Sequence, residues 1–351
     1  MATISAAIMS HPSRQHEATL LARRLDCFNP VVVLDPAPDE EPSALRAAAE
    51  AWALAGSADY HLVLQDDVVP CRDFTSLLGH CAERSPTPVT ALFADWASAN
   101  GQSVRLAALR GDSYAPMVQA SVPPQGLLTR RDEAQRLARE CARAVAAGRT
   151  RDSQLVWEFA VRNGPGACLA VPNLVQHDIA ESASIWPLKV RRGPIRSACF
   201  ADDVRGPIDF RTPRSLPGDL VPYVNWKQQA VIATPARAEQ RSEQVPALEW
   251  LLSAGYDAAG LVGEFRQVLA PHRDGLRPLS QPLLFEVYLA CVATVRLGHR
   301  VDHMCSSCSS AALETMLSGA ARNTADLSSC PRIVAAAREY VAHALHDREW
   351  I

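Results

Sequence analysis

The first half of the chain alternates short apolar strands with amphipathic helical segments, and this order limits the fold more than any other feature. Residues 3–9, 31–35 and 61–64 have the length and apolar content of buried strands. Between them, apolar residues recur at helical spacing, and Ser13 and Ser43 stand where helix caps are expected. A strand–helix–strand–helix order predicts an α/β fold, with a parallel sheet flanked by helices on both faces.

The pattern continues to about residue 190 and then changes. We expect strands at 89–93 and 167–171, with two helices between them that end at Gly148 and Asn163. Recurring prolines then predict a long irregular connector, and the last third has helical periodicity. The chain therefore divides into an α/β domain at 1–190, a connector at 191–245 and a helical region at 246–351.

Charge and hydropathy exclude several classes of protein. The formal net charge is −3, so no strongly basic surface for nucleic acid is expected. The first residues lack the basic start of a signal peptide and resemble a strand. The longest apolar run, 283–297, contains Glu286 and Arg296 and is too short to cross a bilayer. We therefore expect a cytoplasmic protein without a membrane span, whose ten cysteines are mostly reduced core thiols.

Two adjacent carboxylates, Asp66 and Asp67, close the strand at 61–64. Ligands of open α/β sheets bind beyond the carboxyl ends of the strands, so this position is suited to a site. Like charges side by side repel, and a divalent cation relieves that repulsion. Carboxylate oxygens suit Mg²⁺ or Mn²⁺, and such an ion binds a diphosphate. The alternative is that the pair only caps the following turn.

The segment 58–68, Ala-Asp-Tyr-His-Leu-Val-Leu-Gln-Asp-Asp-Val, resembles the strand and DxD segment of the GT-A-fold glycosyltransferases. These enzymes use nucleotide-sugar donors, and the resemblance covers roughly residues 1–189. It implies a mixed, mostly parallel sheet in place of a wholly parallel one. Gln65 replaces the first carboxylate of the motif, which leaves Asp67 as the favoured metal ligand and Asp66 on the donor ribose or the metal.

Three further segments resemble the family in the expected order. Gly126, in Pro-Pro-Gln-Gly-Leu-Leu, corresponds to a loop that approaches the donor sugar, although a simple turn is an alternative role. Asp152 corresponds to the general base of inverting members, and its alternative role is a plain helix cap. His177 corresponds to a histidine that contacts the metal, and its alternative is a histidine in a loop or core.

The donor nucleotide is expected at the ends of the first two strands. By the same resemblance, the backbone from Ser10 through His11 to Pro12 and the side chain of Asp35 would hold uracil and ribose. Arg14 is placed to reach a phosphate, because a guanidinium pairs well with one. The alternative is that Ser13 caps a helix and Arg14 is solvated.

Together these segments imply a transferase that moves a sugar from a nucleotide diphosphate donor, with a UDP-sugar favoured, to an acceptor hydroxyl. Mn²⁺ or Mg²⁺ would stabilise the leaving group, and Asp152 would deprotonate the acceptor with inversion at the anomeric carbon. Two alternatives remain. A nucleotidyltransferase normally has a glycine-rich phosphate loop, which residues 10–14 lack. The other is a non-catalytic nucleotide-sugar-binding module.

The C-terminal region carries a second cluster with Cys305 and Cys308 near His299 and His303. A Cys-x-x-Cys pair with a nearby histidine is compatible with zinc, while two reduced cysteines on a buried helix are the alternative. The helices at 282–297 and 331–346 are expected to pack on the first domain, cover the acceptor site or form a homodimer contact.

Overall fold

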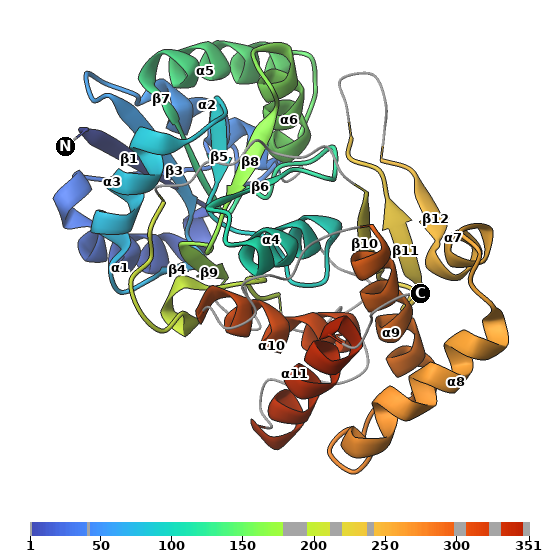
Figure 1. The fold of residues 1–351 in the computed structure, drawn as a ribbon. Coiled ribbons are helices and arrows are strands. Elements are labelled where there is room, and N and C mark those ends of the chain that lie inside the picture. Colours follow the sequence, from blue (N-terminus) through green and yellow to red (C-terminus); the bar gives the residue numbers. More distant parts are fainter. Residues whose placement is uncertain are drawn as a thin grey trace.

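The computed structural model describes residues 2–40, 43–177, 195–210, 220–236, 242–297, 307–322 and 331–346. A seven-stranded sheet lies at the centre of the first part of the chain (Figure 1). Its strands, in spatial order, are β2 (Val31–Leu34), β1 (Ile4–Ser10), β3 (Tyr60–Gln65), β7 (Gly126–Arg130), β5 (Val89–Ala91), β8 (Ala167–Ala170) and β6 (Tyr114–Pro116). Strands β7 and β6 run against the other five. The prediction of a mixed, mostly parallel sheet is confirmed.

Side-chain alternation along the strands divides the core into two layers. Ala7 and Met9 of β1 face a cluster with α2 (Ala44–Ala53), α5 (Arg131–Ala146) and α6 (Asp152–Arg162). Ala6 and Ile8 face a cluster with α1 (Gln15–Arg24) and α3 (Phe74–Arg84) on the other side. Successive residues of a strand point to opposite faces, so both faces of this sheet are covered by helices, as predicted.

A short two-stranded ribbon lies beyond the carboxyl end of β3. Its strands are β4 (Val68–Pro70) and β9 (Val175–His177), which pair antiparallel with Val68 opposite His177. The ribbon places a late segment of the chain beside the residues that follow β3, and Figure 1 shows it at the lower edge of the sheet.

Helix α4 (Ala99–Arg110) is buried on every side from Ala99 to Leu109. The Ser98 side chain accepts a hydrogen bond from the Gly101 amide at its start, and Gly111 ends it with φ +75°. The helix lies between the sheet and the C-terminal part of the chain, against α10 (Ser307–Ala321) and β10 (Val221–Val224) (Figure 1). It therefore joins the two parts into one packed body.

The prediction of an irregular connector at 191–245 is wrong for the second half of that range. Strands β10 (Val221–Val224), β11 (Ala230–Ala233) and β12 (Gln244–Pro246) form an antiparallel sheet there. Pro222, one of the recurring prolines of this region, lies within β10 at the sheet edge, where a missing amide donor is tolerated. The apolar runs at 221–224 and 230–233 are buried, and they pair across a short turn as β10 and β11.

The last part is helical, as predicted. It contains α7 (Ala247–Ser253), α8 (Ala258–Leu269), α9 (Gln281–Arg296), α10 (Ser307–Ala321) and α11 (Pro331–His346). These helices share a core with β10 and β11, and α9 is buried along most of its length. Short 3-10 turns complete the chain at Pro12–Arg14, Asp26–Phe28, Ala201–Asp203 and Ala270–His272. Among the described residues, no helix combines the length and the apolar character needed to span a bilayer.

Three local expectations were wrong. The strand expected to be buried at 31–35 is β2, an edge strand with Val31 46% exposed, because no other described strand pairs beyond it in this sheet. The helical spacing of Leu20, Leu21 and Leu25 predicts one buried face for α1, yet Leu20 is 49% exposed. Ser13 does not cap α1, since it lies inside the 3-10 turn that precedes the helix, and there its amide donates to His11 Nδ1.

Candidate functional site

Asp66 follows β3 directly, and its carboxylate is held from the end of β1. Ser10 Oγ donates to Asp66 Oδ2 at 2.5 Å, and Arg14 Nε donates to Asp66 Oδ1 at 3.0 Å. Burial raises the pKa of Asp66 above its ordinary value, although both hydrogen bonds and the Arg14 charge oppose the shift. Each oxygen of Asp66 thus already has a donor, and the carboxylate ties the 10–14 turn to the end of β3.

Asp67 has a different environment from its neighbour. Its Oδ2 lies 3.2 Å from His177 Nε2, and its Oδ1 is buried without a hydrogen-bond partner. The β4–β9 ribbon brings the two residues together, because Val68 and His177 are paired in register. The His177 ring lies 6.3 Å from the ring of Phe93, just after β5. Asp67 and His177, far apart in sequence, therefore meet at the carboxyl end of the sheet.

This pair fits a divalent cation in part. A buried carboxylate oxygen without a donor is costly, and a cation would satisfy it. A carboxylate oxygen and an imidazole nitrogen are both suitable ligands for Mn²⁺. Within the ranges that the structure describes, no group of three His, Cys, Asp or Glu residues is arranged to hold a metal. The remaining ligands would therefore come from water and from phosphate oxygens, which is common for Mg²⁺ sites.

The predicted ligand role of Asp66 stays a prediction. Each Asp66 oxygen already accepts one hydrogen bond, which leaves each oxygen one further lone pair for an ion. The arrangement separates the two carboxylates into an ion pair with Arg14 and a candidate metal ligand beside His177.

The predicted nucleotide-binding residues of the first turn lie together. Ser10 ends β1, and its carbonyl accepts the Asp35 amide at 3.0 Å, so the ends of β1 and β2 are adjacent. His11 Nδ1 lies 2.7 Å from Ser13 Oγ, and Pro12 starts the 3-10 turn. Arg14 uses Nε for Asp66, and its two Nη groups have no hydrogen-bond partner in the described chain. They remain available to an anion at this edge.

The Asp35 carboxylate is paired with Arg46, a partner that the sequence did not predict. Arg46 on α2 binds it with two hydrogen bonds, Nε to Oδ1 at 2.9 Å and Nη2 to Oδ2 at 3.1 Å. Burial raises the pKa of Asp35, but the hydrogen bonds from Arg46 and the Ala37 amide outweigh it and hold the pKa below its ordinary value. The carboxylate fixes the β2–α2 connection, so a contact with ribose would have to share it with Arg46.

Gly126 lies at the start of β7, opposite Leu64. A Cβ at this position would come 3.1 Å from Leu64 Cδ2 and 3.3 Å from Val175 Cγ2. Packing against these core side chains therefore accounts for the glycine, while its predicted approach to a donor sugar stays a prediction. The Gln125 carbonyl just before it accepts the Gln65 amide at 3.1 Å.

Asp152 is the first residue of α6 and is 7% exposed. Its Oδ1 accepts a hydrogen bond from the Ser153 amide at 2.7 Å, but the N-cap of α6 is Arg151, so Asp152 is not the plain helix cap of the alternative. Burial raises the pKa of Asp152, and the two backbone hydrogen bonds only partly oppose it. The structure does not join Asp152 to Asp66, Asp67 or His177 through any described hydrogen bond or ion pair.

The side-chain amides of Asn173 and Gln176 position the segment that carries His177, and the sequence did not predict either role. Asn173 Oδ1 accepts the Ala94 amide at 3.1 Å and the Ser197 hydroxyl at 2.7 Å, and its Nδ2 donates to Ala170 O. Gln176 Oε1 accepts the amides of His177 and Ser197. A buried Asn beside a strand end is a weak sequence signal for such a role, because its partners come from distant segments.

The candidate zinc cluster lies mostly outside the described residues, including Cys305. Cys308 lies on α10, and Cys199 Sγ donates to its carbonyl at 3.6 Å. This contact links α10 to the segment at 195–210.

Comparison of the chain with models of protein families finds no match, and comparison with curated proteins finds none either. A functional assignment therefore depends on the geometry of the strand ends.

Proposed function

We propose that this chain is a metal-dependent glycosyltransferase of the GT-A type, which moves a sugar from a nucleotide diphosphate donor to an acceptor hydroxyl. One observation carries the proposal: His177 Nε2 lies 3.2 Å from Asp67 Oδ2, while Asp67 Oδ1 is buried and unpartnered. The pair lies at the carboxyl end of a mostly parallel sheet, where ligands of such sheets bind.

The charges around the pair suit a donor diphosphate. Arg14 is anchored by Asp66 through Nε and keeps its Nη groups for a phosphate. Burial lowers the pKa of Arg14, but the attraction of Asp66 outweighs it and raises the pKa, so the cation persists at any working pH. Ser10, His11 and Pro12 present a turn held to β2 and β3, which suits the nucleoside end of the donor, with a UDP-sugar favoured.

In this mechanism Asp67 and His177 would hold Mn²⁺ or Mg²⁺, which would supply Lewis-acid stabilisation of the leaving diphosphate. The chain's own contribution is orientation: the β4–β9 ribbon sets the two ligands, and Asp66 holds Arg14 beside them. Asp152 stays the proposed base for the acceptor, with inversion at the anomeric carbon. Its raised pKa favours proton uptake, since a base works best when its pKa is near the working pH.

The burial of Asp152 favours one alternative, a nucleotide-sugar-binding module without transfer. At 7% exposure the carboxylate meets an acceptor only if the side chains over it move. Such a module would bind the donor and metal through the same residues and release no nucleoside diphosphate.

A panel of nucleotide-sugars with Mn²⁺, followed by release of nucleoside diphosphate, tests the proposal. Slow donor hydrolysis or transfer in the wild type, lost in Asp67→Asn and in His177→Gln, would support it. His80→Gln, on the exposed side of α3, is the matched control and should keep the activity. Metal-dependent donor binding without turnover would indicate the binding module, and absence of both would remove the assignment.

A further inference from the structure

Cys199 and Cys308 lie against each other although they are 109 positions apart in the chain. Cys199 belongs to the segment at 195–200, and Cys308 lies on α10. The Cys199 thiol donates to the Cys308 carbonyl, with Sγ 3.6 Å from the oxygen, and it also hydrogen-bonds the Cys308 sulfur. The two side chains are therefore in direct contact.

Backbone and side-chain hydrogen bonds hold Cys199 against α10. The Thr315 hydroxyl donates to Ala198 O, and Thr315 follows Cys308 by about two helical turns, so both lie on one face of α10. On the other side, the Cys199 carbonyl accepts the Asn173 amide at 2.7 Å. The contact between the thiols thus belongs to a packed interface that both segments keep in place.

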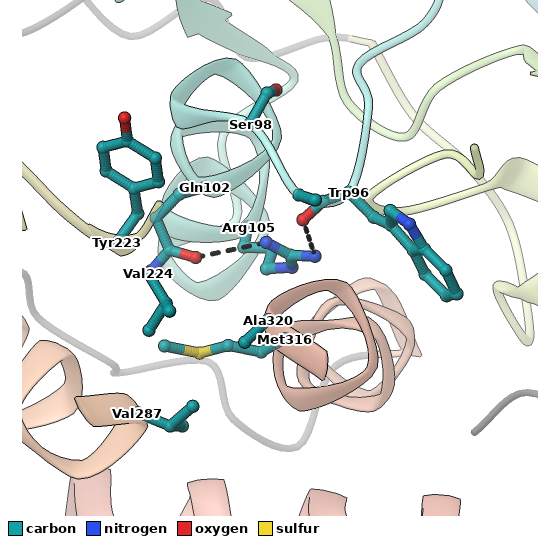
Figure 2. Close-up of a pocket in the computed structure, with 10 residues that line it drawn as sticks. Trp96, Ser98, Gln102, Arg105, Tyr223, Val224, Val287, Met316 and Ala320 are labelled. Carbon is teal, nitrogen blue, oxygen red and sulfur yellow. Dashed lines mark hydrogen bonds between the residues drawn. The ribbon is translucent and has the colours of Figure 1, made fainter. Parts of the chain in front are cut away.

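Arg105 on α4 strengthens the same interface. In Figure 2, which shows the pocket at this junction, its guanidinium lies between α4 and α10. Nη2 donates to Trp96 O at 2.6 Å and to Thr315 O at 2.8 Å. The hydrogen bond to Cys308 and burial raise the pKa of Cys199 well above its ordinary value, and the charge of Arg105 only partly opposes them. Cys199 is therefore a protonated thiol.

The two thiols differ in protonation and in access to solvent. Cys199 is buried, whereas Cys308 is partly exposed. The hydrogen bond from Cys199 lowers the pKa of Cys308, although burial opposes the shift. By contrast, burial raises the pKa values of Cys71 and Cys141 to about 12. Because oxidants react with a thiolate and need access to it, Cys308 is the more reactive member of the pair.

We propose that Cys308 is an oxidation site for hydroperoxides and that Cys199 is its resolving cysteine. The Cys308 thiolate attacks one oxygen of hydrogen peroxide, the O–O bond breaks, and a sulfenic acid forms as hydroxide leaves. The Cys199 sulfur then attacks the Cys308 sulfur and the S–O bond breaks. The leaving oxygen takes up the Cys199 proton and departs as water. The two sulfurs together lose two electrons, and the peroxide gains them.

The disulfide would fasten α10 to the segment that supports the candidate site. In that segment, the Ser197 amide donates to Gln176 Oε1 at 2.6 Å, directly before His177. The bond would join positions 109 residues apart, and a link over a long stretch of chain restricts the unfolded state strongly. Oxidation should therefore stabilise the chain.

Peptide mapping of the full chain is the first test and needs no variant. The reduced chain, freed of reductant, is treated with equimolar hydrogen peroxide and digested under non-reducing conditions. A linked pair of peptides that carries Cys199 and Cys308, and that separates in dithiothreitol, would support the proposal. A link from Cys308 to another cysteine, or a Cys308 that stays reduced while other thiols are oxidised, would overturn it.

Three variants assign the roles of the two thiols. Cys199→Ser removes the resolving thiol, so the Cys308 sulfenic acid should persist and be labelled by dimedone. Cys308→Ser should lose the link and leave Cys199 unlabelled. Cys305→Ser is the matched control, because this rival thiol lies three positions before Cys308, and it should keep the link. Loss of the link in Cys305→Ser, or no label on Cys308 in Cys199→Ser, would contradict the assignment.

Thermal unfolding checks that the bond fits the packing. The oxidised wild type should unfold at a higher midpoint than the reduced chain, and dithiothreitol should restore the lower value. Cys308→Ser should show the same midpoint before and after peroxide. An oxidised midpoint at or below the reduced one would mean that the packed thiols cannot join without distortion, and the proposal would be wrong.

Discussion

Asp66 and Asp67 are adjacent in sequence, yet their carboxylates have separate partners. Asp66 pairs with Arg14 at 3.0 Å and Asp67 lies 3.2 Å from His177. The repulsion expected between two neighbouring carboxylates is thus relieved twice, once by a guanidinium and once by an imidazole. The two residues should therefore respond differently to substitution.

Asp67→Asn should weaken Mn²⁺ binding by more than the roughly 10–100-fold that loss of a supporting residue costs, because it removes a ligand oxygen. Asp66→Asn, the neighbouring control, should keep most of the affinity. Calorimetric titration with Mn²⁺ measures both. Equal losses in the two variants would show that Asp66 is a ligand as well.

Arg14→Met should destabilise the fold by about 3 kcal/mol at neutral pH, because it leaves the Asp66 charge buried with only Ser10 beside it. The side chains of Arg14 and Asp66 are only 12% and 9% exposed, so solvent screens the pair little. Urea unfolding measures the loss, and Arg14→Met with Asp66→Asn should recover part of it. A double variant no better than Arg14→Met would contradict the ion-pair account.

The same variant should show a defined pH dependence. The pKa of Asp66 is already raised by burial, and loss of Arg14 raises it further. The folded state then keeps a proton that the unfolded chain has lost, so the stability of Arg14→Met falls as pH rises above about 4. Its deficit against the wild type should be smaller at pH 4.5 than at pH 7, as measured by unfolding at both values.

Asp152→Asn tests the second buried carboxylate. Burial raises the folded pKa of Asp152, so its contribution to stability declines as pH rises from about 4 towards that pKa. Asn keeps an oxygen for the Ser153 amide and does not titrate. The variant should gain stability relative to the wild type between pH 4 and pH 7, by about 1.4 kcal/mol for each unit of the shift. A constant difference across that range would contradict a raised pKa.

Gly319→Ala probes the contact of α10 with the segment after β5. The added Cβ would lie 2.4 Å from Trp96 O, which is backbone, so the helix has to shift, at a cost of about 1–3 kcal/mol. Gly263→Ala on α8 is the control, because nothing lies within 4 Å of its added Cβ and alanine favours a helix by about 1 kcal/mol. Thermal unfolding should move in opposite directions for the two variants.

Much of the strand and helix order of the first half could be predicted because burial there follows the periodicity of a strand or a helix, although α3, α4, β4, β6 and β7 were not predicted. Residues 61–64, the helix ending at Gly148 and the long apolar helix near residue 290 all formed as expected. The sheet at β10–β12 was missed because prolines and glycines around it resemble a loop in one dimension. Burial against α9 makes those runs into strands.

Residue type and local position selected Asp66, Asp67 and Arg14 as polar groups near strand ends, and the family resemblance selected His177. Only the tertiary structure decided which of them meet. Asp66 pairs with Arg14 and Asp67 with His177 through strand pairing between segments far apart in the chain, whereas Asp35 pairs with Arg46 on the helix that follows it. The sequence around a residue determines its local preference for a strand, helix or turn. Which distant strands pair, and in which register, depends on the packing of the whole chain and cannot be read from a short segment.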